Sequence, residues 1–104
     1  MIELFQAEWC PYSHRVRQRL TELGVDFVAR QVEADPDARQ ALKKASGQTS
    51  IPTLVDGDVV VTDPDQIVAY LDERFEFRAD AERHREQAIE EAEQLAQPPP
   101  RWAG

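Results

Sequence analysis

The one cysteine of the chain, Cys10, stands in the segment Cys10-Pro11-Tyr12-Ser13, where a short alternating strand gives way to a helix. Free N–H groups and the positive end of the dipole at a helix N-terminus favour a thiolate, and they lower a cysteine pKa from ~8.5 toward ~3.5–7.5. The Ser13 hydroxyl can donate a hydrogen bond to the sulfur. The same helix adds positive charge through Arg15, Arg17 and Arg19. The pattern therefore predicts that Cys10 is a nucleophile and not merely a small buried apolar residue.

Two later turns could complete a binding site around this sulfur. The first is Ser50-Ile51-Pro52; only ~5–6% of X-Pro bonds in folded proteins are cis, so the position of Pro52 alone does not predict that geometry. If it is cis, the Ile51 N–H and C=O lie exposed at the end of a strand and could pair with an extended peptide; otherwise Pro52 simply starts a strand. The second is Asp63-Pro64 at a helix start, where spare amides would suit a carboxylate. Asp63 caps that helix in either case, and Pro64 removes one amide.

The spacing of apolar residues predicts the first three elements that must position these residues. Alternation predicts a strand over 2–6. Pro11 suits a first helical position, and apolar residues at helical spacing with Gly24 as a left-handed stop predict a helix over 11–23. A run rich in β-branched and aromatic residues predicts a second strand over 25–32.

The second half contains a hairpin between two helices. Asp35 is expected to cap a short helix that ends at Ser46-Gly47. Strands over 51–55 and 59–61 flank Asp56-Gly57, a strong hairpin signal. The last of these helices starts at Asp63-Pro64 and carries an apolar face of Ile67, Leu71 and Phe75.

These elements follow the order β-α-β-α-β-β-α within 75 residues, which predicts an α/β fold with a mixed four-stranded sheet and helices on its faces. We expect residues 1–75 to form this domain. Residues 76–97 carry seven acids against three bases and form an acidic C-terminal helix with a thin apolar stripe. Residues 98–104 form a stiff, proline-rich tail.

Composition excludes several classes of function. The chain has 104 residues, 12 Lys plus Arg and 20 Asp plus Glu, for a net charge of −8. This argues against nucleic acid or an anionic membrane as a partner. No apolar run approaches the ~20 residues of a membrane span, and the N-terminus does not have the pattern of a signal peptide. A single cysteine permits no internal disulfide and no cysteine-based zinc site, so we expect a cytoplasmic protein with no metal.

Three motifs, in this order and spacing, resemble those of glutaredoxins and of the N-terminal thioredoxin-fold domain of glutathione transferases: Cys10-Pro11-Tyr12-Ser13, Ser50-Ile51-Pro52 and Thr62-Asp63. The stretch 10–17 is especially similar to stringent starvation proteins. The resemblance covers about residues 1–75 and implies a thioredoxin-like fold with a C-terminal helical extension.

The resemblance also implies a glutathione site. In it Cys10 is the nucleophile, Tyr12 and Ser13 flank the bound thiol, and Asp63 lies near its γ-glutamyl end. Ile51, before a cis Pro52, pairs with the backbone of the tripeptide's cysteine. Two positions depart from the families: Ala7 stands where glutaredoxins often carry Lys, and Asp63-Pro64 where transferases usually have Glu-Ser.

Ser13 replaces the second cysteine of a dithiol motif, so a monothiol cycle remains. We expect a glutaredoxin-like oxidoreductase with glutathione or a related small thiol as co-substrate and mixed-disulfide proteins as partners, acting as a monomer or weak homodimer. One alternative is a non-catalytic regulatory module similar to stringent starvation proteins. Another is a [2Fe–2S] carrier in which two chains share a cluster through Cys10 and glutathione, although Pro11 stiffens the loop. A Cys10–His14 pair is conceivable, but a thiolate at a helix end needs no base.

Overall fold

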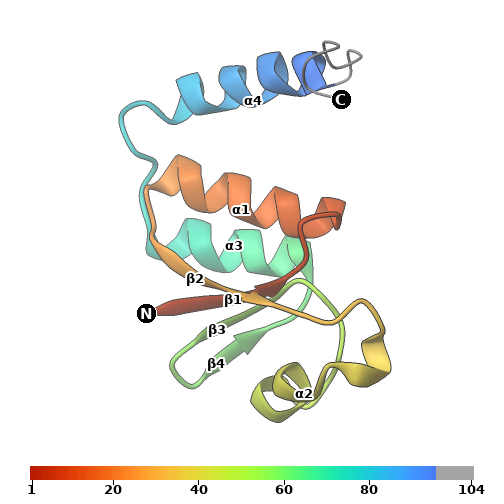
Figure 1. The fold of residues 1–104 in the computed structure, drawn as a ribbon. Helices are drawn as coiled ribbons and strands as arrows, with labels where there is room; N and C mark the ends of the chain where they lie inside the picture. The colour runs from red at the N-terminus through yellow and green to blue at the C-terminus, as the bar shows by residue number, and fades with distance from the viewer. Residues whose placement is uncertain (96–104) are drawn as a thin grey trace.

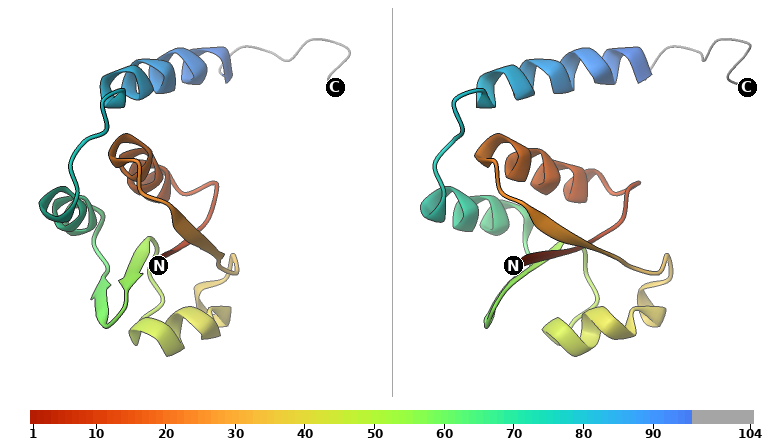
Figure 2. Two further views of the ribbon diagram at one scale, coloured as in Figure 1. Left: turned by 90° about the vertical axis from the view of Figure 1, so that its left-hand side faces the viewer. Right: turned by 60° about the vertical axis from the view of Figure 1, so that its left-hand side comes forward.

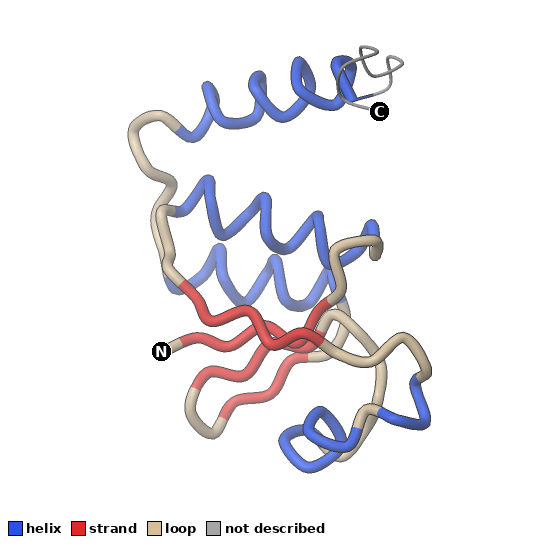
Figure 3. The backbone as a smooth tube through the Cα atoms, in the orientation of Figure 1, coloured by secondary structure: helices blue, strands red, loops and turns tan. Residues whose placement is uncertain are grey.

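A four-stranded mixed sheet organises the computed structural model, which describes residues 1–95 (Figure 1). Its strands are β1 (Ile2–Gln6), β2 (Phe27–Gln31), β3 (Thr53–Asp56) and β4 (Val59–Val61), in the order β2-β1-β3-β4. β1 pairs in parallel with β2, whereas the β1–β3 and β3–β4 pairs are antiparallel. The predicted mixed sheet is therefore confirmed, and Figure 3 shows its strands as one layer.

Helices cover the sheet from two sides. α1 (Pro11–Leu23) and α3 (Pro64–Arg74) pack against each other on one face, and the short α2 (Gln40–Ser46) lies beyond the opposite face (Figure 2). The predicted order β-α-β-α-β-β-α is confirmed. Because β1 and α1 are consecutive, the end of β1 delivers the chain directly to the N-terminus of α1.

The core lies between the sheet and the α1–α3 layer. Its centre is apolar side chains with no solvent exposure: Leu4, Val16, Leu20, Leu54, Ile67 and Leu71. Each such side chain stabilises the fold by roughly 1.5–3 kcal/mol through burial. These residues come from β1, α1, β3 and α3, so packing holds together the four elements that carry the predicted site.

Three element boundaries differ from the prediction for local reasons. β2 starts at Phe27 because Gly24, at φ 66°, ends α1 and the Val25 N–H still donates to the Leu20 carbonyl at 2.9 Å. β3 starts at Thr53 because the peptide before Pro52 is cis and turns the chain there. Asp35 caps a 3₁₀ turn over Pro36–Ala38 and not α2 itself.

A further helix, α4 (Ala81–Leu95), follows this unit and packs on α1 (Figures 1 and 2). Arg85 Nε lies 2.9 Å from Oε1 of the buried Glu22, and Gln18 Nε2 donates to the His84 carbonyl at 3.3 Å. The predicted C-terminal helix is thus present. Its last expected residues, 96 and 97, and the proline-rich tail at 98–104 lie outside the described residues. None of the helices within 1–95 has the length and apolarity that crossing a membrane requires.

Candidate functional site

Cys10 is the N-cap residue of α1. Its Sγ accepts a hydrogen bond from the Ser13 N–H at 3.4 Å, and its own N–H donates to the Ala7 carbonyl at 3.1 Å. Only 6% of Cys10 is exposed, so water competes little with the hydrogen bond from the Ser13 N–H to the sulfur. The side chain of Cys10 thus caps the helix as a serine or aspartate would, and a thiolate is the stronger acceptor in that position.

Several groups determine the protonation of this sulfur. Burial raises the pKa of the Cys10 thiol, but the Ser13 hydroxyl, the N–H groups of Ser13 and Tyr12 and the charge of Arg17 together outweigh it. The pKa of Cys10 is therefore held below its ordinary value of 9.0. His14 forms no hydrogen bond to the sulfur within the described part of the chain, so the conceivable Cys–His pair is not seen.

The arginines of α1 act less uniformly than the sequence suggested. Arg15 pairs with Asp65, and Arg19 pairs with Asp72. Arg17 donates to Gln6 Oε1 and to the exposed Glu8, yet its charge still lowers the pKa of Cys10. All three arginines add charge to α1 as predicted, but carboxylates on α3 neutralise Arg15 and Arg19, so that only Arg17 acts on the pKa of Cys10.

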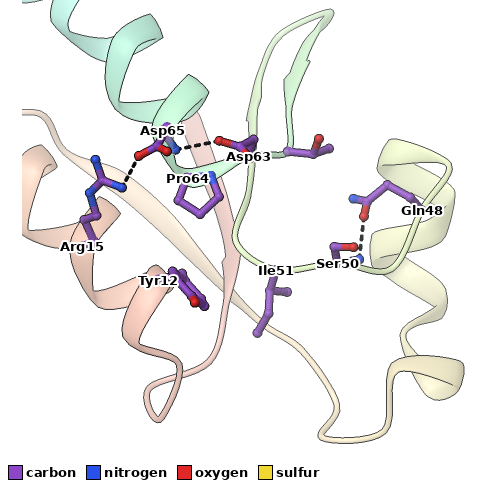
Figure 4. A pocket seen from close by; sticks show the side chains of 9 residues that line it. Tyr12, Arg15, Gln48, Ser50, Ile51, Asp63, Pro64 and Asp65 are labelled. Carbon is purple, nitrogen blue, oxygen red and sulfur yellow. Dashed lines mark hydrogen bonds and ion pairs between the residues drawn. The ribbon is translucent and has the colours of Figure 1, made fainter.

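Next to the start of α1 lies an open cavity of about 650 Å³ (Figure 4). Three segments line it: the first turn of α1, the loop before β3 and the entry to α3. The lining residues are Tyr12, Arg15, Gln48, Ser50, Ile51, Thr62, Asp63, Pro64 and Asp65. The structure thus brings together Tyr12, Ile51 and Asp63, three of the predicted site residues. Cys10, Ser13 and Pro52 do not line the cavity.

Those three residues nevertheless adjoin it along the chain. Cys10 precedes Tyr12 by two residues at the same helix end, and Ser13 is fully buried behind it. The Ile51–Pro52 peptide is cis, with Pro52 buried. The backbone N–H and C=O of Ile51 have no hydrogen-bond partner among residues 1–95, as a backbone that receives an extended ligand requires.

The entry to α3 differs from the predicted anion site. The Asp63 carboxylate accepts from the N–H groups of Asp65 at 2.9 Å and Gln66 at 3.2 Å. Pro64 has no N–H, and the Ile67 N–H already donates to the Asp63 carbonyl. The first turn of α3 therefore keeps no spare amide for a carboxylate, because its own cap uses those it has.

Two residues that the sequence did not single out shape the loop between α2 and β3. Gln48 Nε2 donates to Thr53 Oγ1 at 2.8 Å, and Gln48 Oε1 accepts from the Ser50 N–H. Arg39, only 5% exposed, donates to the carbonyls of Glu33 at 2.7 Å, Thr49 at 3.0 Å and Ala34 at 3.2 Å. Nothing in the sequence distinguishes Arg39 from the solvated arginines of a polar segment.

Comparisons with known proteins agree with this arrangement. The glutaredoxin family model matches residues 2–61. A glutaredoxin of Pseudomonas aeruginosa is 31% identical over 68 residues, which are 65% of this chain and 81% of that protein. A stringent starvation protein A homolog of Coxiella burnetii is 39% identical over 64 residues, 62% of this chain but 30% of that protein.

A solved structure places the same fold in a larger protein. Glutathione S-transferase 1-6 from Anopheles dirus species B superposes with a TM-score of 0.65 at 30% sequence identity, over 75% of this chain and 37% of that one. The likeness therefore covers only part of the transferase, as it covers only part of the stringent starvation protein. The glutaredoxin model, in contrast, matches more than half of this chain, from β1 through β4. This thioredoxin-fold chain belongs to the glutaredoxin family.

Proposed function

We propose that the protein is a monothiol thiol–disulfide oxidoreductase that acts on mixed disulfides between proteins and glutathione or a related small thiol. The observation that carries the proposal is the Cys10 sulfur with its lowered pKa at the start of α1, the helix whose first turn lines an open cavity. A thiolate, not a thiol, is the attacking species in disulfide exchange. Since Cys10 is the only cysteine, the electrons must come from an external thiol.

The cycle has two exchange steps. The Cys10 thiolate attacks the small-thiol sulfur of the mixed disulfide, a new S–S bond forms to Cys10, and the substrate protein leaves as a thiolate that takes up a proton. A second small thiol, as its thiolate, then attacks the small-thiol sulfur bound to Cys10. The two small thiols leave joined as a disulfide, and the Cys10 thiolate is restored. One incoming small thiol is thus oxidised for each substrate sulfur that is reduced, and the proton it loses balances the one that the substrate thiolate takes up.

The cavity suggests how the small thiol is held. We assign the free backbone groups of Ile51 to the peptide backbone of the ligand, with Pro52 fixing their direction. Tyr12, 61% exposed, flanks the ligand from α1, and Ser13 stabilises the sulfur. Asp63 faces the far end of the ligand from the start of α3. Residues 1–75 would suffice for this chemistry, and a reducing cytoplasm would keep the lone thiol free.

The test compares wild-type protein with Cys10→Ser and with Asp58→Asn, an exposed change in the β3–β4 turn. Each is incubated with a glutathionylated peptide and glutathione, and release of the free peptide is followed by mass spectrometry. Wild type and Asp58→Asn should release peptide well above the uncatalysed rate, whereas Cys10→Ser should not. Equal release by Cys10→Ser, with its folding verified by circular dichroism, would refute the assignment.

A second candidate is a non-catalytic interaction module. The observation in its favour is the 39% identity to the stringent starvation protein A homolog over 62% of this chain. Under this alternative, folded wild-type protein would show no transfer from mixed disulfides with several small thiols. The pH dependence of Cys10 alkylation would then be that of an ordinary cysteine.

A further inference from the structure

One polar side chain occupies the face of β1 that packs against α1. Ile2, Leu4 and Gln6 alternate onto this face, and the first two belong to the apolar core. Gln6 is enclosed as they are, since only 1% of it is exposed. A buried amide costs free energy unless it is hydrogen-bonded, whereas an apolar residue of similar size would need no partner. The partners of Gln6 therefore indicate what the amide does there.

The side-chain amide of Gln6 joins β2 to α1. Its Nε2 donates to Gln31 Oε1 at 2.9 Å, and Gln31 is the residue beside Gln6 in the β1–β2 register. Its Oε1 accepts a hydrogen bond from the guanidinium of Arg17. Because β2 engages the nitrogen end of the amide, the carbonyl end is directed toward α1. Gln6 thus holds the Arg17 guanidinium at the end of β1, just before the loop that leads to Cys10.

This contact fixes the guanidinium without cancelling its charge. The buried partner of Arg17 is a neutral amide, whereas the other two arginines of α1 form ion pairs with carboxylates of α3. Arg17 also lies 3.2 Å from the carboxylate of Glu8, but that side chain is 86% exposed, so water and salt screen it. The side chain of Arg17 itself is only 18% exposed. Its positive charge therefore remains effective on the side of the loop.

Other charged groups at the interfaces of α1 and between β1 and β2 are engaged in ion pairs of their own. These pairs are Arg15–Asp65 and Arg19–Asp72 with α3, Arg85–Glu22 with α4, and Arg30–Glu3 between the two strands. The pKa of Cys10 is lowered by hydrogen bonds from Ser13 and Tyr12 and by the charge of Arg17. The position of the Arg17 guanidinium therefore matters for the sulfur.

Resting on the proposed function, we infer that Gln6 is a positioning residue for the reaction at Cys10: it holds the Arg17 guanidinium beside the loop and leaves its charge free to stabilise the attacking thiolate. A leucine at this position would leave the guanidinium without its buried acceptor. A glutamate would hold it but would cancel its charge. The two replacements should therefore weaken the thiolate for different reasons.

The pH dependence of Cys10 alkylation by iodoacetamide tests the inference. Arg17→Met should move the midpoint upward, Gln6→Leu should move it upward by less, and Gln6→Glu by about as much as Arg17→Met. Gln6→Glu keeps the shape of the side chain, so it provides the test if circular dichroism shows that Gln6→Leu does not fold. Gln87→Glu, the same substitution at an exposed position of α4, should leave the midpoint unchanged.

A double variant shows whether Gln6 acts through Arg17. Gln6→Leu added to Arg17→Met should cause no further shift, because there is no guanidinium left to hold. An equal shift by Gln6→Leu with and without Arg17 would overturn the inference, as would unchanged midpoints in folded Gln6→Leu and Gln6→Glu. Either result would leave the oxidoreductase proposal intact.

Transfer of glutathione from a glutathionylated peptide to Cys10 connects the midpoint to the reaction. Gln6→Leu should slow single-turnover transfer at pH values below its shifted midpoint, where less thiolate is present, and should match wild type above it. Slower transfer at all pH values would overturn the inference, because it would indicate a general structural defect. No transfer by wild-type protein would refute the proposed function, and with it the role of Gln6 in that reaction.

Discussion

Replacing Arg39 by Met should destabilise the protein and loosen one wall of the cavity. The guanidinium donates three hydrogen bonds to carbonyls on both sides of the α2 segment, and it has no carboxylate partner among residues 1–95. One of these carbonyls belongs to Thr49, which directly precedes Ser50 and Ile51 in the cavity wall. Arg39 is thus a positioning residue for the loop that would hold the ligand.

The size of the effect follows from two opposing contributions. Hydrogen bonds to a charged group contribute about 1.5–3 kcal/mol each, so three contribute roughly 4.5–9 kcal/mol. Burying a guanidinium without a counter-ion costs several kcal/mol. The arginine should therefore stabilise the fold by a net amount of about 2 kcal/mol, and its loss should lower the melting temperature by roughly 10 °C.

Urea unfolding measures the loss of stability, and kinetics on a glutathionylated peptide measure the functional effect. Arg39→Met should raise KM several-fold, because the Ile51 backbone is less well held. The pH profile of Cys10 alkylation should stay unchanged, because Cys10 belongs to α1 and Arg39 does not act on its pKa. Arg39→Lys, which retains the charge but loses the fork of donors, should recover only part of the stability. A loss below about 0.5 kcal/mol in Arg39→Met would refute the reasoning.

Three further outcomes follow from the structure. Because the pKa of Cys10 is lowered in the folded state, the thiolate stabilises that state fully at pH values above the ordinary pKa of 9.0. This contribution is lost as pH falls through the folded-state pKa. The stability advantage of wild type over Cys10→Ser, measured by urea unfolding under reducing conditions, should therefore grow with rising pH. Ser13→Ala should move the pH profile of Cys10 alkylation upward, since the Ser13 hydroxyl is the largest contribution that lowers this pKa; an unmoved profile would show that the amides alone set it. Arg85→Met should weaken the docking of α4 on α1 by about 1–2 kcal/mol, because it removes a partner of the buried Glu22; hydrogen exchange should accelerate in α4 but not in β1, and uniform acceleration would contradict independent docking.

The order and type of the elements could be predicted because their signals are local. Alternation in β1, helical spacing in α1 with Gly24 at its end and the Asp56-Gly57 turn each lie within a few residues of the structure they specify. The boundaries that moved depend on contacts between neighbouring elements. Val25, for example, is β-branched like a strand residue, yet its N–H completes the cap of α1.

The site likewise has features that local sequence predicts and features that depend on contacts between distant segments. The position of Cys10 at a helix start is a property of a short segment, so the sequence could predict it, whereas the cis peptide at Pro52 was expected only through the resemblance to known families. The buried position of Arg39 depends on two separate stretches of chain folding around it. No property of Arg39 or of its neighbours in the sequence predicts that it is buried.

The charge of the cavity shows why long-range pairing matters for specificity. The sequence indicates a helix with three arginines beside a reactive cysteine, a pattern that favours anionic ligands. The fold instead pairs Arg15 with Asp65, fifty positions away, and Arg19 with Asp72. Because α1 and α3 pack side by side, their charged side chains neutralise each other before a ligand arrives. The charge that a ligand meets beside the cysteine motif therefore depends on carboxylates of α3, which no residue within that motif indicates.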